Sequence, residues 1–117
     1  MESSINTEAY IDLTDGLKRV GGNMTLYRRL MKLFVDGHHF ENLNSELKNG
    51  NIEKAKEFAH ALKGLSANLS FSKINAYTVA LEAELKDGQD YSETLSGLRQ
   101  AFAATLGKIE EITSLND

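Results

Sequence analysis

Apolar residues recur along the chain at intervals of three and four positions, which is the spacing of amphipathic helices. The periodicity breaks at 21–23, 49–51, 69–70 and 87–88, and three of these breaks contain glycine. The chain has no proline, so nothing in its composition interrupts a helical backbone. These features predict an all-α fold.

The breaks separate four helical segments, which we expect at residues 23–48, 51–69, 72–86 and from 90 onward. Asn23 is a favoured N-cap residue, and Gly37 is expected to bend or split the first segment. Asp90-x-x-Glu93 has the pattern of a capping box at the start of the fourth. Short connections favour antiparallel neighbours, so the sequence predicts an up-and-down four-helix bundle.

The predicted organisation is one domain with two short ends. Residues 1–20 form a leader with a short helix around 14–20, whose Leu13, Leu17 and Val20 would cover one end of the core. Residues 21–114 form the bundle, and 115–117 form a tail. We expect this bundle to be a monomer.

Composition narrows the class of protein. Hydrophobic residues make up 41% and charged residues 26% of the 117 residues, as in soluble globular domains. The absence of cysteine excludes disulfides and thiolate metal sites and fits the cytoplasm. No apolar run is long enough for membrane insertion, and a net charge of -4 with interspersed signs makes nucleic acid an unexpected partner.

The segment 52–69 separates into two faces when its residues are placed about 100° apart. The face centred on His60 holds Glu53, Lys56, Glu57, Lys63, Gly64 and Ala67. The opposite face holds Ala55, Phe58, Leu62, Leu65, Ser66 and Leu69. His60 is therefore predicted to face solvent.

The neighbours of His60 on this face include one glycine, Gly64, and two lysines, Lys56 and Lys63. Glycine inside a helix costs about 1 kcal/mol relative to alanine, and a side chain at position 64 would lean over the ring of His60. Lys56 and Lys63 lie about one turn from His60, where ammonium groups would attract a phosphoryl dianion. The pattern predicts a nucleophile with an open approach and no general base.

The stretch Ala59-His60-Ala61-Leu62-Lys63-Gly64-Leu65-Ser66-Ala67-Asn68-Leu69 resembles the A-H-x-L-K-G-x-[AS]-x-x-[LIV] signature of histidine-containing phosphotransfer (HPt) domains. Gly21-Gly22-Asn23, Gly50-Asn51 and Leu81-Glu82 also fit the layout of that family, over roughly residues 12–106. One departure is Ser70, where the family often has glycine, and it bears on the loop after the histidine helix.

The resemblance implies a carrier rather than an enzyme, with no ATP site and no cofactor. His60 would be phosphorylated by a receiver-domain aspartyl phosphate, Lys63 would steady the phosphoryl group, and Gly64 would give access. Lys56, Ala67 and Asn68 are the residues we expect at the docking surface. The implied partners are receiver domains of response regulators or hybrid sensor kinases, with the Mg²⁺ bound by the receiver and no metal here.

Glu57-x-x-His60 resembles half of the motif of di-metal helical bundles, but a second Glu-x-x-His and further inward glutamates are missing. His38 and His39 are expected at the surface or at a helix end. A helical interaction or dimerisation module without phosphotransfer remains the alternative. The sequence also leaves open whether the chain is freestanding or the cytoplasmic C-terminal domain of a membrane-bound hybrid kinase.

Overall fold

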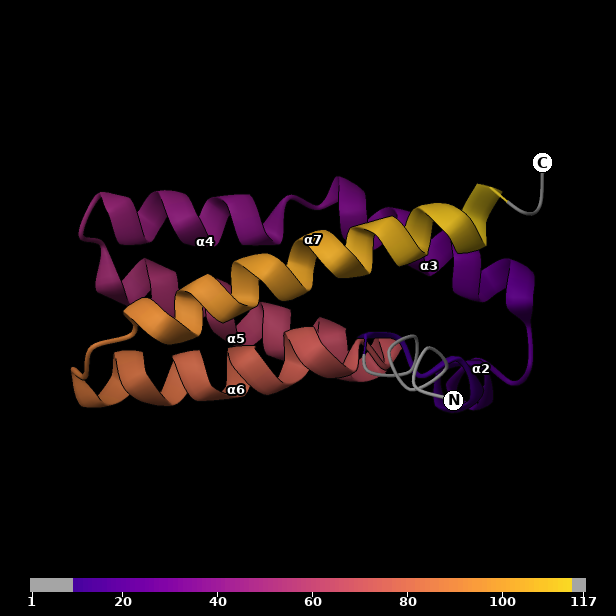
Figure 1. The fold of residues 1–117 in the computed structure, drawn as a ribbon, viewed down its shortest axis with the longest axis horizontal. Helices are drawn as coiled ribbons and strands as arrows, with labels where there is room; N and C mark the ends of the chain where they lie inside the picture. Colours follow the sequence, from indigo (N-terminus) through magenta and orange to yellow (C-terminus); the bar gives the residue numbers. More distant parts are fainter. Residues whose placement is uncertain (1–9, 115–117) are drawn as a thin grey trace.

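The computed structural model describes residues 10–114, and this part of the chain is helical without a strand (Figure 1). The helices are α2 (Leu13–Arg19), α3 (Met24–Asp36), α4 (His39–Lys48), α5 (Ile52–Leu69), α6 (Ser72–Asp87) and α7 (Ser92–Ser114). The predicted all-α class is confirmed. Most of the predicted leader, residues 1–9, and the predicted tail, residues 115–117, lie outside the described residues. No described helix combines the length and apolar character needed to cross a membrane.

The first predicted segment is two helices, α3 and α4, which follow one another along one edge of the molecule (Figure 1). Gly37 is the C-cap of α3, and His38 has a left-handed backbone with φ 57°. A Cβ on Gly37 would overlap the ring of His39, so a larger residue at this position would require that ring to move. The split expected at Gly37 is confirmed, and His38 and His39 lie at a helix end as predicted.

Of the two predicted helix starts, the one at Asn23 is confirmed and the one at Asp90 is not. Asn23 caps α3, because its side-chain oxygen accepts a hydrogen bond from the Leu26 amide at 3.0 Å. Asp90 accepts instead from the amide of Ser92 at 3.0 Å and from its hydroxyl at 2.7 Å. The capping-box prediction is wrong, because the side chain of Asp90 forms a local turn with Ser92 and α7 begins only at Ser92.

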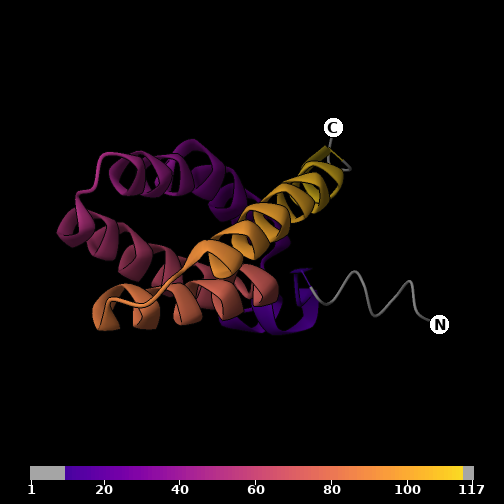
Figure 2. The ribbon, with the colours of Figure 1, turned by 60° about the vertical axis from the view of Figure 1, so that its left-hand side comes forward.

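The helices pack side by side around one apolar core. α5 lies against both α4 and α6, and α7 lies against α6 and α3. In Figure 2, α7 runs obliquely across the other helices. Its first half meets α6, where Gly97 leaves room for the ring of Tyr77, and its last turns meet α3, where Arg28 Nε donates to the Ile112 carbonyl at 3.1 Å. α5 buries Ala55, Ala59, Leu62 and Leu69, so its other face is free for the site.

α2 covers one end of the core, as the sequence predicts. Leu13, Leu17 and Val20 pack against it, and Ile11, just before the helix, is fully buried. The amide of Asp12 donates to the Ser70 carbonyl at 2.9 Å. The N-terminal helix is thereby fastened to the end of α5.

Ser70 takes up a backbone conformation that favours glycine, because its φ is 60°. Its hydroxyl donates to Asp15 Oδ2 at 2.5 Å, and the Arg19 and Ser70 hydrogen bonds lower the pKa of that carboxyl. We expect Ser70→Ala to lower the free energy of unfolding by about 1 kcal/mol, since the hydrogen bond is lost and the strained φ remains. Ser70→Gly should lose less, because glycine relieves the strain. Urea unfolding of both variants tests this, and equal losses would contradict it.

Candidate functional site

His60 lies in the middle of α5 with its side chain 71% exposed. The residues around it explain this orientation, because Ala59 and Leu62 are buried on the inner face of the helix. The predicted division of α5 into an inner and an outer face is confirmed at Leu62, which is buried, and at His60, which is exposed.

A carboxylate from the neighbouring helix reaches the ring. Glu82 of α6 places Oε2 2.8 Å from Nδ1 of His60 and Oε1 2.7 Å from Nζ of Lys63. One carboxylate therefore joins the histidine to the lysine. The sequence predicts a nucleophile without a general base and does not anticipate this carboxylate. Glu82 meets Nδ1 and not the other ring nitrogen.

Sequence reasoning missed Glu82 as a site residue. The sequence feature that could have indicated Glu82 is its position directly after Leu81, which is fully buried in α6. A carboxylate next to a buried position lies at the edge of a helix contact, where it can reach the facing helix.

Glu82 is a charged group at neutral pH. The hydrogen bond from Lys63 lowers its pKa most, and the hydrogen bond from His60 lowers it further, against the opposing effect of partial burial. The side chain of Glu82 is 25% exposed and that of Lys63 is 36% exposed. The pair is thus shielded from solvent more than the ring that it adjoins.

The geometry distinguishes the two ring nitrogens. A carboxylate can only accept, so in the neutral imidazole the proton sits on Nδ1 and Nε2 carries the lone pair. Among the described residues Nε2 has no hydrogen-bond partner. The arrangement therefore presents Nε2 to solvent as a nucleophile.

Gly64 lies one turn beyond His60, and a Cβ added there would meet no atom within 4 Å. At Gly16 and Gly97, by contrast, a Cβ would overlap the rings of Tyr27 and Tyr77. Packing inside the chain therefore explains those two glycines and does not explain Gly64. Glycine at this position lowers the stability of the helix and leaves its surface one turn beyond His60 without a side chain.

The expected docking residues share the outer face of α5 but differ in setting. Ala67 and Asn68 are exposed, whereas Lys56 is half-buried and pairs with Glu53 at 3.0 Å. His60, Gly64 and Ala67 form a strip of the helix without large side chains beyond the imidazole itself. Within this strip no large neighbouring side chain covers the imidazole of His60.

A groove of about 570 Å³ continues this face toward α3. It is lined by Arg19, Val20, Leu30, Leu33, Phe34, His39, Leu65, Asn68 and Leu69. Leu33, a large apolar side chain of this lining, is 58% exposed. Asn68 at the groove lies about 12 Å along the helix axis from His60, at 1.5 Å per residue. The groove and the histidine thus belong to one surface.

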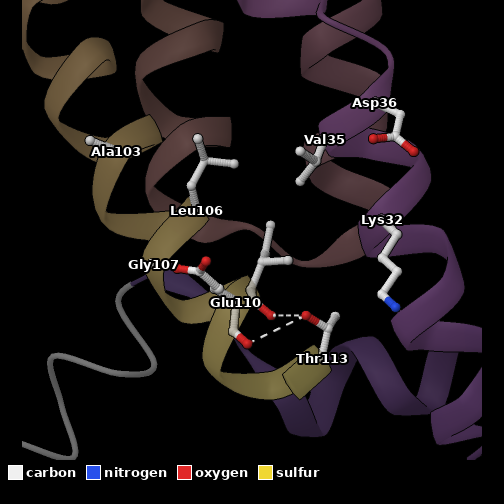
Figure 3. Close-up of a pocket in the computed structure, with 9 residues that line it drawn as sticks. Lys32, Val35, Asp36, Ala103, Leu106, Gly107, Glu110 and Thr113 are labelled. Atoms are coloured by element: carbon white, nitrogen blue, oxygen red, sulfur yellow. Dashed lines mark hydrogen bonds between the residues drawn. The ribbon is translucent and has the colours of Figure 1, made fainter. Parts of the chain in front are cut away.

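Another groove, of about 610 Å³, lies between α3 and α7 (Figure 3). Its charged residues are Lys32, Asp36 and Glu110, and the hydroxyl of Thr113 is already donated to the Ile109 carbonyl at 2.9 Å. Its lining has no histidine and no other strong nucleophile. The candidate site is therefore the surface around His60.

Within the described residues, no three His, Cys, Asp or Glu side chains are grouped so that they could hold a metal ion.

One comparison with known proteins identifies the family of this chain. The family model of the Hpt domain matches residues 33–112, a span that covers well over half of the chain and includes His60, Lys63, Gly64 and Glu82. Searches of curated proteins and of solved structures gave no match. The chain belongs to the Hpt domain family, whose members are carriers in histidine phosphotransfer.

Proposed function

We propose that His60 accepts a phosphoryl group from the aspartyl phosphate of one receiver domain and passes it to the aspartate of another. The observation that carries this proposal is the exposed imidazole, held at Nδ1 by Glu82 and open at Nε2. An acyl phosphate is already activated, so a nucleophile without a general base suffices. The chain is then a covalent carrier, and Mg²⁺ and turnover come from the receiver.

The proposed step is an in-line displacement at phosphorus. The Nε2 lone pair forms the N–P bond as the bond between phosphorus and the aspartate oxygen breaks. The electron pair of that bond leaves with the aspartate carboxylate. Transfer onward reverses these events on a second receiver, so no net hydrolysis is required.

Lys63 would steady the phosphoryl group by turning its ammonium from Glu82 toward the phosphoryl oxygens. Its Nζ is 2.7 Å from Oε1 of the same carboxylate whose Oε2 meets His60, so the ammonium and the ring share one neighbour. We expect Lys63→Ala to slow phosphorylation of His60 about tenfold, the value of one charge-assisted hydrogen bond. Rapid-quench transfer kinetics measure this. Lys54→Ala removes an exposed lysine of the same helix that lies outside the proposed docking surface, and it serves as the control. A Lys63→Ala rate equal to that of the control would exclude the role.

The docking surface would join the strip around His60 to the groove that contains Leu33. Ala67 belongs to this strip, Asn68 belongs to the lining of the groove, and Lys56 lies about one turn before His60. An apolar helix face of the receiver fits the groove, while the small residues let the receiver aspartate approach the ring. Such an interface would be small and transient.

The supporting fold would be the antiparallel four-helix bundle, with α3 and α4 together forming its first arm and α2 its N-terminal extension. We propose that the bundle acts as a monomer in the cytoplasm, where receivers of response regulators and hybrid kinases are found. No cofactor of its own is needed for this role.

The proposal is tested by mixing the protein with each phosphorylated receiver of its host and following radiolabelled phosphate. We expect rapid transfer to this chain from at least one receiver, giving a label that is stable in alkali and labile in acid. Failure with every receiver would contradict the proposal and favour a helical interaction module without phosphotransfer.

A further inference from the structure

A groove of about 470 Å³ lies between the end of α4 and the start of α7, and the proposed chemistry does not use it. α4 packs on α5, and α7 packs on α6 and α3, whereas α4 and α7 do not pack closely along their length. They meet at the rings of Phe40 and Phe102, whose centroids are 4.7 Å apart. Beyond this contact the groove is lined by Asn44, Leu47, Lys48, Tyr91, Leu95 and Arg99.

The lining combines an apolar floor with positive charge. Leu47 is buried, and Leu95 and the ring of Tyr91 are half-buried against the core. Lys48 and Arg99 are exposed, and no carboxylate belongs to the lining. The four polar side chains of the lining make no hydrogen bond or ion pair with another described residue. The groove thus holds two cations that the described chain does not neutralise.

The two larger grooves have a different charge pattern. The groove between α3 and α7 contains Lys32 together with Asp36 and Glu110. In the groove of the proposed docking surface, Arg19 is already paired with Asp15 at 2.8 Å. The whole chain has a net charge of -4, so two unpaired cations over an apolar floor run against its overall charge. The chemical complement of the α4–α7 groove is a ligand that is both acidic and apolar.

We propose that this groove binds an acidic segment of a second protein, with an apolar side chain on the floor and carboxylates beside Lys48 and Arg99. A carboxylate can accept two parallel hydrogen bonds from the guanidinium of Arg99. The apolar side chain of the segment would lose its contact with water on Leu47 and Leu95. Because the surface is small and the cations are exposed, we expect weak binding that falls as salt is added.

The groove is separate from the surface around His60. Its lining belongs to α4 and to the start of α7, while His60 and Glu82 project from α5 and α6. It shares no residue with the groove that continues the His60 face. An acidic segment bound here therefore leaves the face of His60 open to a receiver, and the groove would tether a second protein without blocking phosphoryl transfer.

The first test uses a synthetic peptide in which Asp and Glu residues flank one leucine. Titrated into the ¹⁵N-labelled full chain, it should shift the backbone amides of residues 44–48 and 91–99. Two control peptides carry Asn and Gln in place of the acids, or Ser in place of the leucine, and each should bind at least about tenfold more weakly. No binding, or shifts spread over exposed lysines elsewhere such as Lys54 and Lys73, would overturn the proposal.

The second test changes the protein. Lys48→Gln combined with Arg99→Gln should weaken binding of the acidic peptide about tenfold or more. Lys73→Gln combined with Arg29→Gln is the matched control, because it removes the same charge from exposed positions on α6 and α3 and should change the affinity by less than about twofold. Equal affinities of the two double variants would contradict the proposal. The comparison of the three peptides uses wild-type protein only, so it decides the matter even if a variant does not fold.

The separation of the two surfaces has its own measurement. Phosphoryl transfer from a receiver to His60 should proceed at the same rate with and without saturating acidic peptide. Inhibition by the peptide would place its binding on the receiver surface and would overturn the assignment to the α4–α7 groove. A wild-type protein that no receiver labels would refute the carrier role and leave the peptide titrations to decide the groove.

Discussion

His60→Gln should abolish phosphoryl labelling by a phosphorylated receiver while leaving the fold intact. The amide of glutamine is not a nucleophile, so no phosphoramidate bond can form at this position. The stability should change by less than about 1 kcal/mol, because the side chain is 71% exposed and its one ionic contact is with Glu82. Labelling followed by gel autoradiography gives the first result, and thermal unfolding gives the second.

The chain supplies its own control for this experiment. His38 is also exposed, and its Nδ1 lies 2.6 Å from Glu41, so it resembles His60 in its carboxylate partner. It has no glycine one turn beyond and does not lie on the face of α5. His38→Asn, which suits the left-handed backbone there, should label as wild type does. A label that persists in His60→Gln, or disappears in His38→Asn, would place the acceptor elsewhere.

Gly64→Leu should slow transfer about a hundredfold or more, because a bulky side chain at this position displaces the receiver aspartate from Nε2. The same change should raise helix stability by up to about 1 kcal/mol, since leucine is a better helix former than glycine. No packing clash opposes it, because a Cβ at this position meets nothing within 4 Å. Stability and transfer rate are thus predicted to change in opposite directions.

Gly107 provides the matched control for Gly64. It is also a helical glycine around which a Cβ would meet no atom within 4 Å, but it lies on α7 at the groove shown in Figure 3. Gly107→Leu should give the same kind of helix stabilisation and an unchanged transfer rate. Stopped-flow transfer and urea unfolding of both variants decide the matter, and equal transfer rates in the two variants would contradict the open approach to His60.

The sequence predicts those features that depend on one helix. The outward position of His60 follows from the periodicity of α5, because Ala55, Ala59 and Leu62 recur on its inner face. The break at Gly37 is equally local, since it comes from one residue and the ring two positions on. Helical geometry alone determines such features, so they can be predicted without knowledge of the tertiary contacts.

Features that depend on two helices are harder to predict. Glu82 is 22 residues from His60 in sequence, and only the register of α6 against α5 brings its carboxylate to Nδ1. The groove with Leu33 likewise requires α2, α3 and α5 to be in place. The predicted start of α7 is wrong for another reason, because the Asp90 carboxylate accepts from the Ser92 amide in a local turn and does not cap the helix.

The central claim is that Nε2 of His60 carries the phosphoryl group, and it is tested most directly by locating that group on the wild-type protein. The chain, labelled with ¹⁵N in its histidine rings and phosphorylated by a receiver, should show in its ³¹P spectrum a phosphorus coupled to one ring nitrogen, Nε2 of His60. Phosphorus bound to any other residue, or no bound phosphorus after receiver treatment, would contradict the account.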